Sequence, residues 1–182
     1  MSIVVVWASP NAEGLTAHCK DQVMKGLAAA GQEAEAIQLN ALQLERCRVC
    51  GNGFGACNGG HCIIEDDLSQ VYTKLQAAEK IVWITPVYWH DLAEPLKALL
   101  DRVRRMETRH NHALANKPCL LIAAAGGSGN GATRALQLLE ETLKHMQMVP
   151  LDRLPITQFS RAYMLEAIEK AAEAFAQAET EA

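Results

Sequence analysis

The sequence predicts an α/β protein in which a parallel sheet is covered by helices on both faces. Short apolar, β-branched runs alternate with amphipathic segments along the chain, as in a series of βαβ units. The first run, residues 3–7, is continuously apolar, as expected of a strand buried on both faces. The chain has 182 residues, a usual length for one domain, so we expect a single domain over residues 1–182.

Apolar periodicity places each element. Strands are expected where apolar, largely β-branched residues follow one another, and helices where apolar residues recur three or four positions apart. Gly31 terminates the first helix, and Asp66 and Asp67 cap the second. Segment 41–65 has no clear period and is expected to be a long loop. In chain order, the expected elements are strand 3–7, helix 14–30, strand 34–39, a helix from 66 to at least 75, strand 80–85, helix 92–106, strand 119–125, helix 132–146, strand 148–151 and helix 161–177.

Composition and charge exclude several classes of function. Hydrophobic residues make up 49% of the chain and charged residues 21%, which is ordinary for a globular protein and argues against disorder. A net charge of −4 offers no general attraction for nucleic acid or an anionic membrane. No apolar run reaches the ~18–20 residues that span a bilayer, and the first residues lack the basic segment of a signal peptide. We therefore expect a cytoplasmic protein that binds neither nucleic acid nor membrane.

Three loops at one edge of the sheet are candidate binding segments, because ligands of parallel α/β sheets bind beyond the carboxyl ends of the strands. The first loop, residues 8–16, joins a strand to a helix and carries hydroxyl and amide groups but no lysine or arginine. Free N–H groups and the helix dipole favour a phosphate there. The alternative is an ordinary helix cap formed by Ser9 or Asn11. The residues expected at the phosphate are Ser9, Asn11, Gly14, Leu15 and Thr16.

The second loop, residues 85–91, places the adjacent aromatic residues Tyr88 and Trp89 directly after a predicted strand. A planar heterocycle could stack on these rings while backbone groups bind its polar edge. The alternative is that both rings pack under the loop as part of the core.

The third loop, residues 124–132, has four glycines within six residues, so its backbone can approach a ligand closely. Residues 127–132 also match the G-x-G-x-x-A dinucleotide fingerprint, with Asp152 twenty residues further on. This NAD-binding alternative is disfavoured by position, because the fingerprint normally follows the first strand and only about one strand and one helix remain here.

These segments resemble the flavodoxin-like NAD(P)H-dependent FMN reductases, and in particular the branch that contains the iron–sulfur flavoproteins. The resemblance is carried by Ser-Pro-Asn at 9–11 with Gly14 and Thr16, by Thr-Pro-Val-Tyr-Trp at 85–89, and by Leu-Lys-Ala-Leu-Leu-Asp-Arg at 96–102. It implies a flavodoxin-like three-layer sandwich with a five-stranded parallel sheet in the order 2-1-3-4-5. It also implies FMN, with its phosphate on the first loop, and a homodimer or homotetramer. The residues implied around the isoalloxazine are Pro86, Val87, Tyr88, Trp89, His90, Gly126, Gly127, Ser128 and Gly129.

The same resemblance implies an oxidoreductase in which FMN accepts a hydride from NAD(P)H and electrons pass to a quinone, a flavin or an iron–sulfur partner. Because the flavin itself carries the reactive atoms, no catalytic side chain is required. The alternative is a non-enzymatic flavin carrier or redox sensor without a nicotinamide site. Flavodoxin-type carriers are usually strongly acidic, and the net charge of −4 disfavours that alternative.

Four of the six cysteines, Cys47, Cys50, Cys57 and Cys62, lie in the 41–65 loop. Four thiolates on one glycine-containing loop can bind a [4Fe–4S] cluster or a zinc ion. Iron–sulfur flavoproteins space their first three cysteines as C-x2-C-x2-C, whereas here Gly53 stands at the third position. The expected order of preference is a cluster, then reduced thiols, then zinc, and a redox disulfide between Cys47 and Cys50 is a further alternative.

The remaining candidate groups are expected to be structural. Cys19 and Cys119 lie on predicted core faces, and His61 is expected to be a solvated loop residue. A basic cluster near the end of helix 92–106 is expected to complement the helix C-terminus. The alternative is a contact with phosphates of a nicotinamide donor or of a neighbour's flavin. The cluster contains Arg102, Arg104, Arg105, Arg109, His110 and His112.

Overall fold

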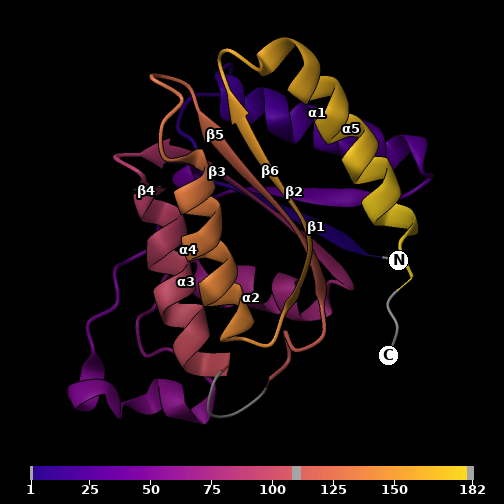
Figure 1. Cartoon of the computed structure of the whole chain (residues 1–182). Coiled ribbons are helices and arrows are strands. Elements are labelled where there is room, and N and C mark those ends of the chain that lie inside the picture. Colours follow the sequence, from indigo (N-terminus) through magenta and orange to yellow (C-terminus); the bar gives the residue numbers. More distant parts are fainter. Residues whose placement is uncertain (1, 108–111, 180–182) are drawn as a thin grey trace.

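The protein is a three-layer α/β/α sandwich in a computed structural model that describes residues 2–107 and 112–179 (Figure 1). Five parallel strands lie in the order β2-β1-β3-β5-β6, and a short strand, β4, pairs antiparallel with the end of β3. The predicted parallel sheet and its order are therefore confirmed, and β4 is an addition. The strands are β1 (Ile3–Trp7), β2 (Ala34–Gln38), β3 (Lys80–Tyr88), β4 (Asp91–Leu92), β5 (Pro118–Ala125) and β6 (Val149–Thr157).

Helices cover both faces of the sheet (Figure 1). On one face lie α1 (Leu15–Ala29) and α5 (Arg161–Gln177), and on the other lie α2 (Leu68–Ala77), α3 (Glu94–Met106) and α4 (Ala132–Lys144). All five predicted helices are present. None of the helices within the described residues is both long enough and apolar enough to cross a membrane.

Two strands are longer than predicted. β3 continues to Tyr88 because its end pairs with β4, and β6 covers Val149–Thr157 rather than residues 148–151. Pro150 and Pro155 lie within β6, and the pairing with β5 shifts register directly after Pro150. Since β6 is an edge strand, one of its sides needs no ladder hydrogen bonds, so proline is tolerated there.

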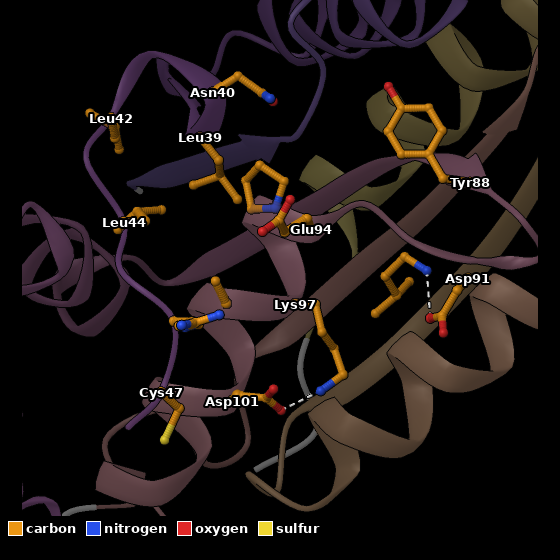
Figure 2. Close-up of a pocket in the computed structure, with 14 residues that line it drawn as sticks. Leu39, Asn40, Leu42, Leu44, Cys47, Tyr88, Asp91, Glu94, Lys97 and Asp101 are labelled. Carbon is orange, nitrogen blue, oxygen red and sulfur yellow. Dashed lines mark hydrogen bonds and ion pairs between the residues drawn. The ribbon is translucent and has the colours of Figure 1, made fainter. Parts of the chain in front are cut away.

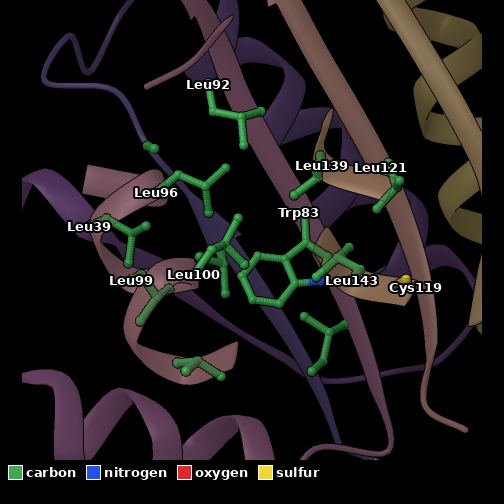
Figure 3. Packing of buried hydrophobic residues seen from close by; sticks show 14 of the residues in the cluster. Leu39, Trp83, Leu92, Leu96, Leu99, Leu100, Cys119, Leu121, Leu139 and Leu143 are labelled. Carbon is green, nitrogen blue, oxygen red and sulfur yellow. The ribbon is translucent and has the colours of Figure 1, made fainter. Parts of the chain in front are cut away.

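The core beneath α2, α3 and α4 is centred on Trp83 of β3, which is fully buried (Figure 3). Leucines from α3 and α4 surround its indole: Leu96, Leu99, Leu100, Leu139 and Leu143. The buried thiols Cys19 and Cys119 belong to the two core clusters, and burial raises the pKa of each to about 12. They are core residues, as predicted.

Gly26 allows α1 and α5 to pack at very short range. A Cβ atom at this position would lie 2.2 Å from the backbone oxygen of Glu169 in α5. Any side chain would therefore force the two helices apart, which explains a glycine in the middle of a helix despite its low helix propensity.

Two lysines close the amino end of the sheet. The Nζ atom of Lys80 donates to three backbone carbonyls at the end of α5, at 2.7–2.9 Å. Lys117 donates in the same way to two carbonyls at the end of α2. A cation is favoured at a helix C-terminus, where carbonyls lack helical partners and the dipole is negative. Desolvation lowers the pKa of both lysines.

Candidate functional site

The N-terminus of α1 lies at the carboxyl end of the sheet beside two buried hydroxyl residues, Ser9 and Thr16. Gly14 is the N-cap residue and has no side chain with which to cap the helix. The Ser9 hydroxyl instead accepts the backbone N–H of Asn11 at 3.2 Å, and the Asn11 carboxamide accepts that of Glu13 at 2.9 Å. The alternative of an ordinary cap by Ser9 or Asn11 is therefore wrong. The first turn also lacks acidic residues, so this helix end suits an anion.

Strands β3 and β4 form a hairpin whose two-residue turn is Trp89-His90. Both residues have positive φ, at 51° and 68°, as in the type I′ turns that usually contain Asn-Gly. The hairpin leaves Tyr88 49% exposed and Trp89 97% exposed. The alternative that both rings pack into the core is therefore wrong. Strained non-glycine residues of this kind cluster at functional sites.

The glycine loop touches this hairpin and the end of β6. Gly131 has a φ of +86°, and a Cβ there would lie 2.7 Å from the Cα of His90. Gly129 has a φ of +81°, and a Cβ there would lie 3.2 Å from Cγ2 of Thr157. Only glycine combines these backbone angles with such close approaches. The loop is thus held between the β3–β4 hairpin and β6.

Beside this contact, the hairpin and the glycine loop together line a cavity of about 180 Å³. It brings together most of the residues expected around a planar ring. Pro86 is buried within β3 instead, Tyr88 lies outside this cavity, and Gly126 is exposed without lining it. The lining residues are Val87, Trp89, His90, Ala125, Gly127, Ser128, Gly129 and Asn130.

A larger groove of about 630 Å³ runs along α3 from Tyr88 to Cys47 (Figure 2). Leu39, Asn40, Leu42 and Leu44 lie along one side in Figure 2, and an ion pair of Lys97 and Asp101 lies on α3. No local sequence pattern predicts this groove, because segments distant in the chain form it. Its other lining residues are Arg46, Asp91, Leu92, Glu94, Pro95 and Ala98.

The four loop cysteines line one small cavity of about 20 Å³, together with Arg102 and Arg105. All are free thiols. Two short turns shape the loop: Cys50–Gly53, whose backbone is left-handed at Gly51 and Asn52, and the 3₁₀ turn Ala56–Gly59. Gly55 lets them approach, because a Cβ there would lie 2.8 Å from the Cys50 carbonyl oxygen. His61 is exposed, as expected.

The four thiols of this loop are the donors that a metal site would use, but the observed conformation is closed. Within the described residues, no three His, Cys, Asp or Glu side chains are grouped so as to hold a metal ion. Zinc needs its thiolates at about 2.3 Å from one point, so the loop in this conformation does not fit a zinc ion. A [4Fe–4S] cluster is also held by four cysteines, and all four thiols line one cavity, so the donor set fits a cluster. A loop that binds such a cluster must be wider than the one observed.

Arg102 was expected to complement the C-terminus of α3, but its side chain is 2% exposed and is paired with the buried carboxylate of Asp66. Its Nη1 and Nη2 atoms lie 2.5 and 2.9 Å from the two carboxylate oxygens. Burial alone would raise the pKa of Asp66, but hydrogen bonds from Arg102 and from backbone N–H groups outweigh it and lower that pKa. Asp66 also accepts the N–H of Leu68 at 3.1 Å, in agreement with its predicted capping role. Asp67, the N-cap residue of α2, was expected to cap as well, but its carboxylate accepts the N–H of Gln43 and makes no cap hydrogen bond. Arg109 and His110 lie outside the described residues.

A parallel sheet with a helix N-terminus, an aromatic hairpin and a glycine loop at its carboxyl end defines a flavodoxin-like protein. The sequence matches the NADPH-dependent FMN reductase family over residues 1–160, and the chain belongs to that family. It is an FMN-dependent oxidoreductase.

The chain is similar in sequence to archaeal iron–sulfur flavoproteins. The chain is 30% identical over 159 residues to an iron–sulfur flavoprotein of Archaeoglobus fulgidus, covering 86% of this chain and 76% of that protein. It is also 30% identical over 112 residues to an iron–sulfur flavoprotein of Methanosarcina thermophila, which is 61% of this chain but only 56% of that protein.

Solved structures share the fold at lower identity. The NAD(P)H:quinone oxidoreductase from Methanothermobacter marburgensis has a TM-score of 0.76 at 17% identity, with 98% of each chain covered. A flavodoxin from the domain Archaea has a TM-score of 0.66 at 16% identity, with 97% of each chain covered. These likenesses confirm the flavodoxin-like fold.

Proposed function

We propose that this protein takes a hydride from NAD(P)H onto FMN and passes the electrons, through a [4Fe–4S] cluster held by its cysteine loop, to a quinone, a flavin or an iron–sulfur partner. The observation that carries this proposal is that the loops after β1, β3 and β5 lie at the same end of the sheet. Cys47 of the cysteine loop and Tyr88 of the hairpin line one groove beside them.

In this proposal the α1 end holds the flavin phosphate. The backbone N–H groups after Gly14 and the hydroxyls of Ser9 and Thr16 supply neutral donors, and Leu15 lies in the same first turn. The helix dipole adds a favourable field for a dianion without a lysine or arginine. Asn11 stiffens the loop through its bond to the Glu13 N–H.

The hairpin and the glycine loop position the flavin ring. Trp89 and His90 border it on one side, and Gly127, Ser128 and Gly129 on the other. When bound, FMN supplies two-electron acceptance from a hydride donor and one-electron release. The backbone of the glycine loop can hydrogen-bond to the polar edge of the ring and so adjust its reduction potential.

The four cysteines would hold the cluster, with Cys47 also lining the groove that leads to Tyr88. A cluster at this place would accept electrons one at a time from a flavin that has been reduced by two. The name iron–sulfur flavoprotein that two relatives carry supports this assignment, although Gly53 stands where the family resemblance implies a third cysteine.

Exposed aromatic residues near the glycine loop support a homodimer or homotetramer. Trp89, which is 97% exposed, and Phe159, which is 76% exposed, lie beside the glycine loop, and Tyr163 of α5 is 64% exposed. Large exposed apolar side chains often mark an interface. Multi-angle light scattering should give a mass of two or four chains, and a monomeric mass would contradict this part of the proposal.

The enzyme and the carrier alternative differ in their response to nicotinamide. Protein purified without oxygen should show two visible flavin bands and broad absorption near 400 nm, with about four iron and four sulfide per chain. NADH or NADPH should bleach the flavin bands in an anaerobic titration. Flavin bands that neither nucleotide bleaches would indicate the carrier. One zinc per chain, or four titratable thiols without metal, would contradict the cluster.

A further inference from the structure

Arg102 contacts both ends of the cysteine loop and one of its sulfurs. From α3, its guanidinium donates to the backbone oxygen of Glu45 at 2.9 Å and to that of Ile64 at 3.4 Å. Its Nη2 atom also lies 3.4 Å from the Sγ of Cys62. The two carbonyls lie just before Cys47 and just after Cys62, so the guanidinium closes the base of the loop.

One N–H donor of the Arg102 guanidinium, the Nε–H group, has no hydrogen-bond partner among the described residues. Arginine has five N–H donors, and the four on the two Nη atoms face Asp66, two carbonyls and a sulfur. The Nε atom is buried. Buried N–H groups are rarely left unpaired. The residue also lines the cavity shared by the four cysteines.

We propose that Arg102 is the positioning residue of the cysteine site, which orients Cys62 toward the cavity and donates hydrogen bonds to the sulfurs of a bound [4Fe–4S] cluster. This inference rests on the proposed function, because it requires the cluster. Asp66 fixes the guanidinium with two bonds, so that its remaining donors point in a set direction.

The role has an electrostatic consequence. A cluster gains one electron on reduction and becomes more negative, with no bond formed or broken. Hydrogen bonds to its sulfurs therefore stabilise the reduced state more than the oxidised state and raise the reduction potential. Lysine at position 102 would keep the charge but lose the planar fork that bonds sulfur, carboxylate and carbonyls together.

The test compares Arg102→Lys with Arg105→Lys. Arg105 lines the same cavity from the same helix, but it donates to the backbone oxygen of Gly53 at 3.4 Å. EPR-monitored titration of anaerobic holoprotein should show a lower cluster potential in Arg102→Lys and a nearly unchanged one in Arg105→Lys. Bound FMN and its potential should not change in either variant.

A second measurement needs no variant. In protein labelled with ¹⁵N-arginine, pulsed EPR of the reduced cluster should detect a hyperfine coupling to nitrogen. A wild-type cluster without that coupling, or an unchanged potential in Arg102→Lys, would overturn the role of Arg102 while leaving the proposed function intact. Wild-type protein that contains flavin but no iron or sulfide would overturn both.

Discussion

The two ends of the sheet differ in whether protein side chains satisfy the hydrogen-bonding groups of the helix termini. At the amino end, Lys80 of β3 and Lys117, just before β5, donate to the last carbonyls of α5 and α2. At the carboxyl end, α1 begins at Gly14 without a side-chain cap, and the neighbouring turn exposes Trp89. One end satisfies its polar groups within the protein and the other keeps donors for a ligand. Stability and binding should therefore respond to different substitutions.

Removing the lysine at the amino end should have the largest effect on stability. Lys80→Met keeps the length of the side chain but leaves three carbonyls of α5 without their donor. We expect the free energy of unfolding to fall by about 3 kcal/mol, since bonds to a buried charge are the strong ones. Urea unfolding of the FMN-free protein measures this, and the dissociation constant of FMN should stay the same. The control is Lys25→Met, whose exposed ion pair with Glu169 should be worth under ~1 kcal/mol. Equal losses in both variants would contradict the prediction.

Substitutions at the carboxyl end of the sheet should instead weaken the binding of FMN. In Ser9→Ala/Thr16→Ala, lost bonds to a charged phosphate should raise the dissociation constant of FMN roughly ten- to hundredfold. Fluorescence titration of the FMN-free protein measures this. Thr73→Ala, on the exposed side of α2, is the control and should bind FMN as the parent does. If the double variant also binds as tightly as the parent, the phosphate does not lie on this loop.

An ion pair at the side of the sheet should control part of the acid stability. Hydrogen bonds from Arg153 and Lys144 lower the pKa of Glu140 from 4.5 to about 2. The unfolded carboxylate therefore takes up a proton first, so this stabilisation is complete above about pH 4.5 and is lost as the pH falls toward 2. Because both cations are well exposed, we expect Glu140→Gln to cost under ~1 kcal/mol at pH 7. Urea unfolding at pH 7 and pH 3 should show that this difference shrinks in acid, and a constant difference would assign it to packing.

Replacing the exposed Trp89 should have the smallest effect on the free energy of unfolding, but should change the fluorescence of the bound flavin. Trp89→Leu should change the free energy of unfolding by less than about 0.5 kcal/mol, because the side chain is almost fully exposed. If Trp89 borders the isoalloxazine, the fluorescence of bound flavin should rise in the variant as quenching by the indole is removed. The same fluorescence in parent and variant would place Trp89 away from the ring.

Periodicity was sufficient for the sheet and the helices but not for the β3–β4 hairpin. Continuous apolar runs and four-residue spacing depend only on which faces are buried, so they predicted five parallel strands and five helices. The turn Trp89-His90 contains no Asn-Gly or other residue typical of type I′ turns. In the structure His90 of this turn packs closely against Gly131, which lies far along the chain.

The candidate site was predictable where it depends on local chain and not where it depends on distant partners. The glycine loop and the aromatic pair lie where the strand–loop–helix order places them. Arg102, however, was expected to complement a helix end, because nothing in its own helix indicates that it contacts Asp66 and Cys62. The groove between Tyr88 and Cys47 was missed for the same reason.

The contact of α1 with α5 at Gly26 also bears on when the flavin can enter the protein. During synthesis, the loop of residues 8–16 leaves the ribosome long before α5 does, yet α1 is covered on one side by α5. The helix that we assign to the phosphate therefore reaches its final setting only after residues 161–177 have been made. Flavin incorporation should accordingly follow translation of this segment, and ribosome-bound chains that end before α5 should retain little FMN.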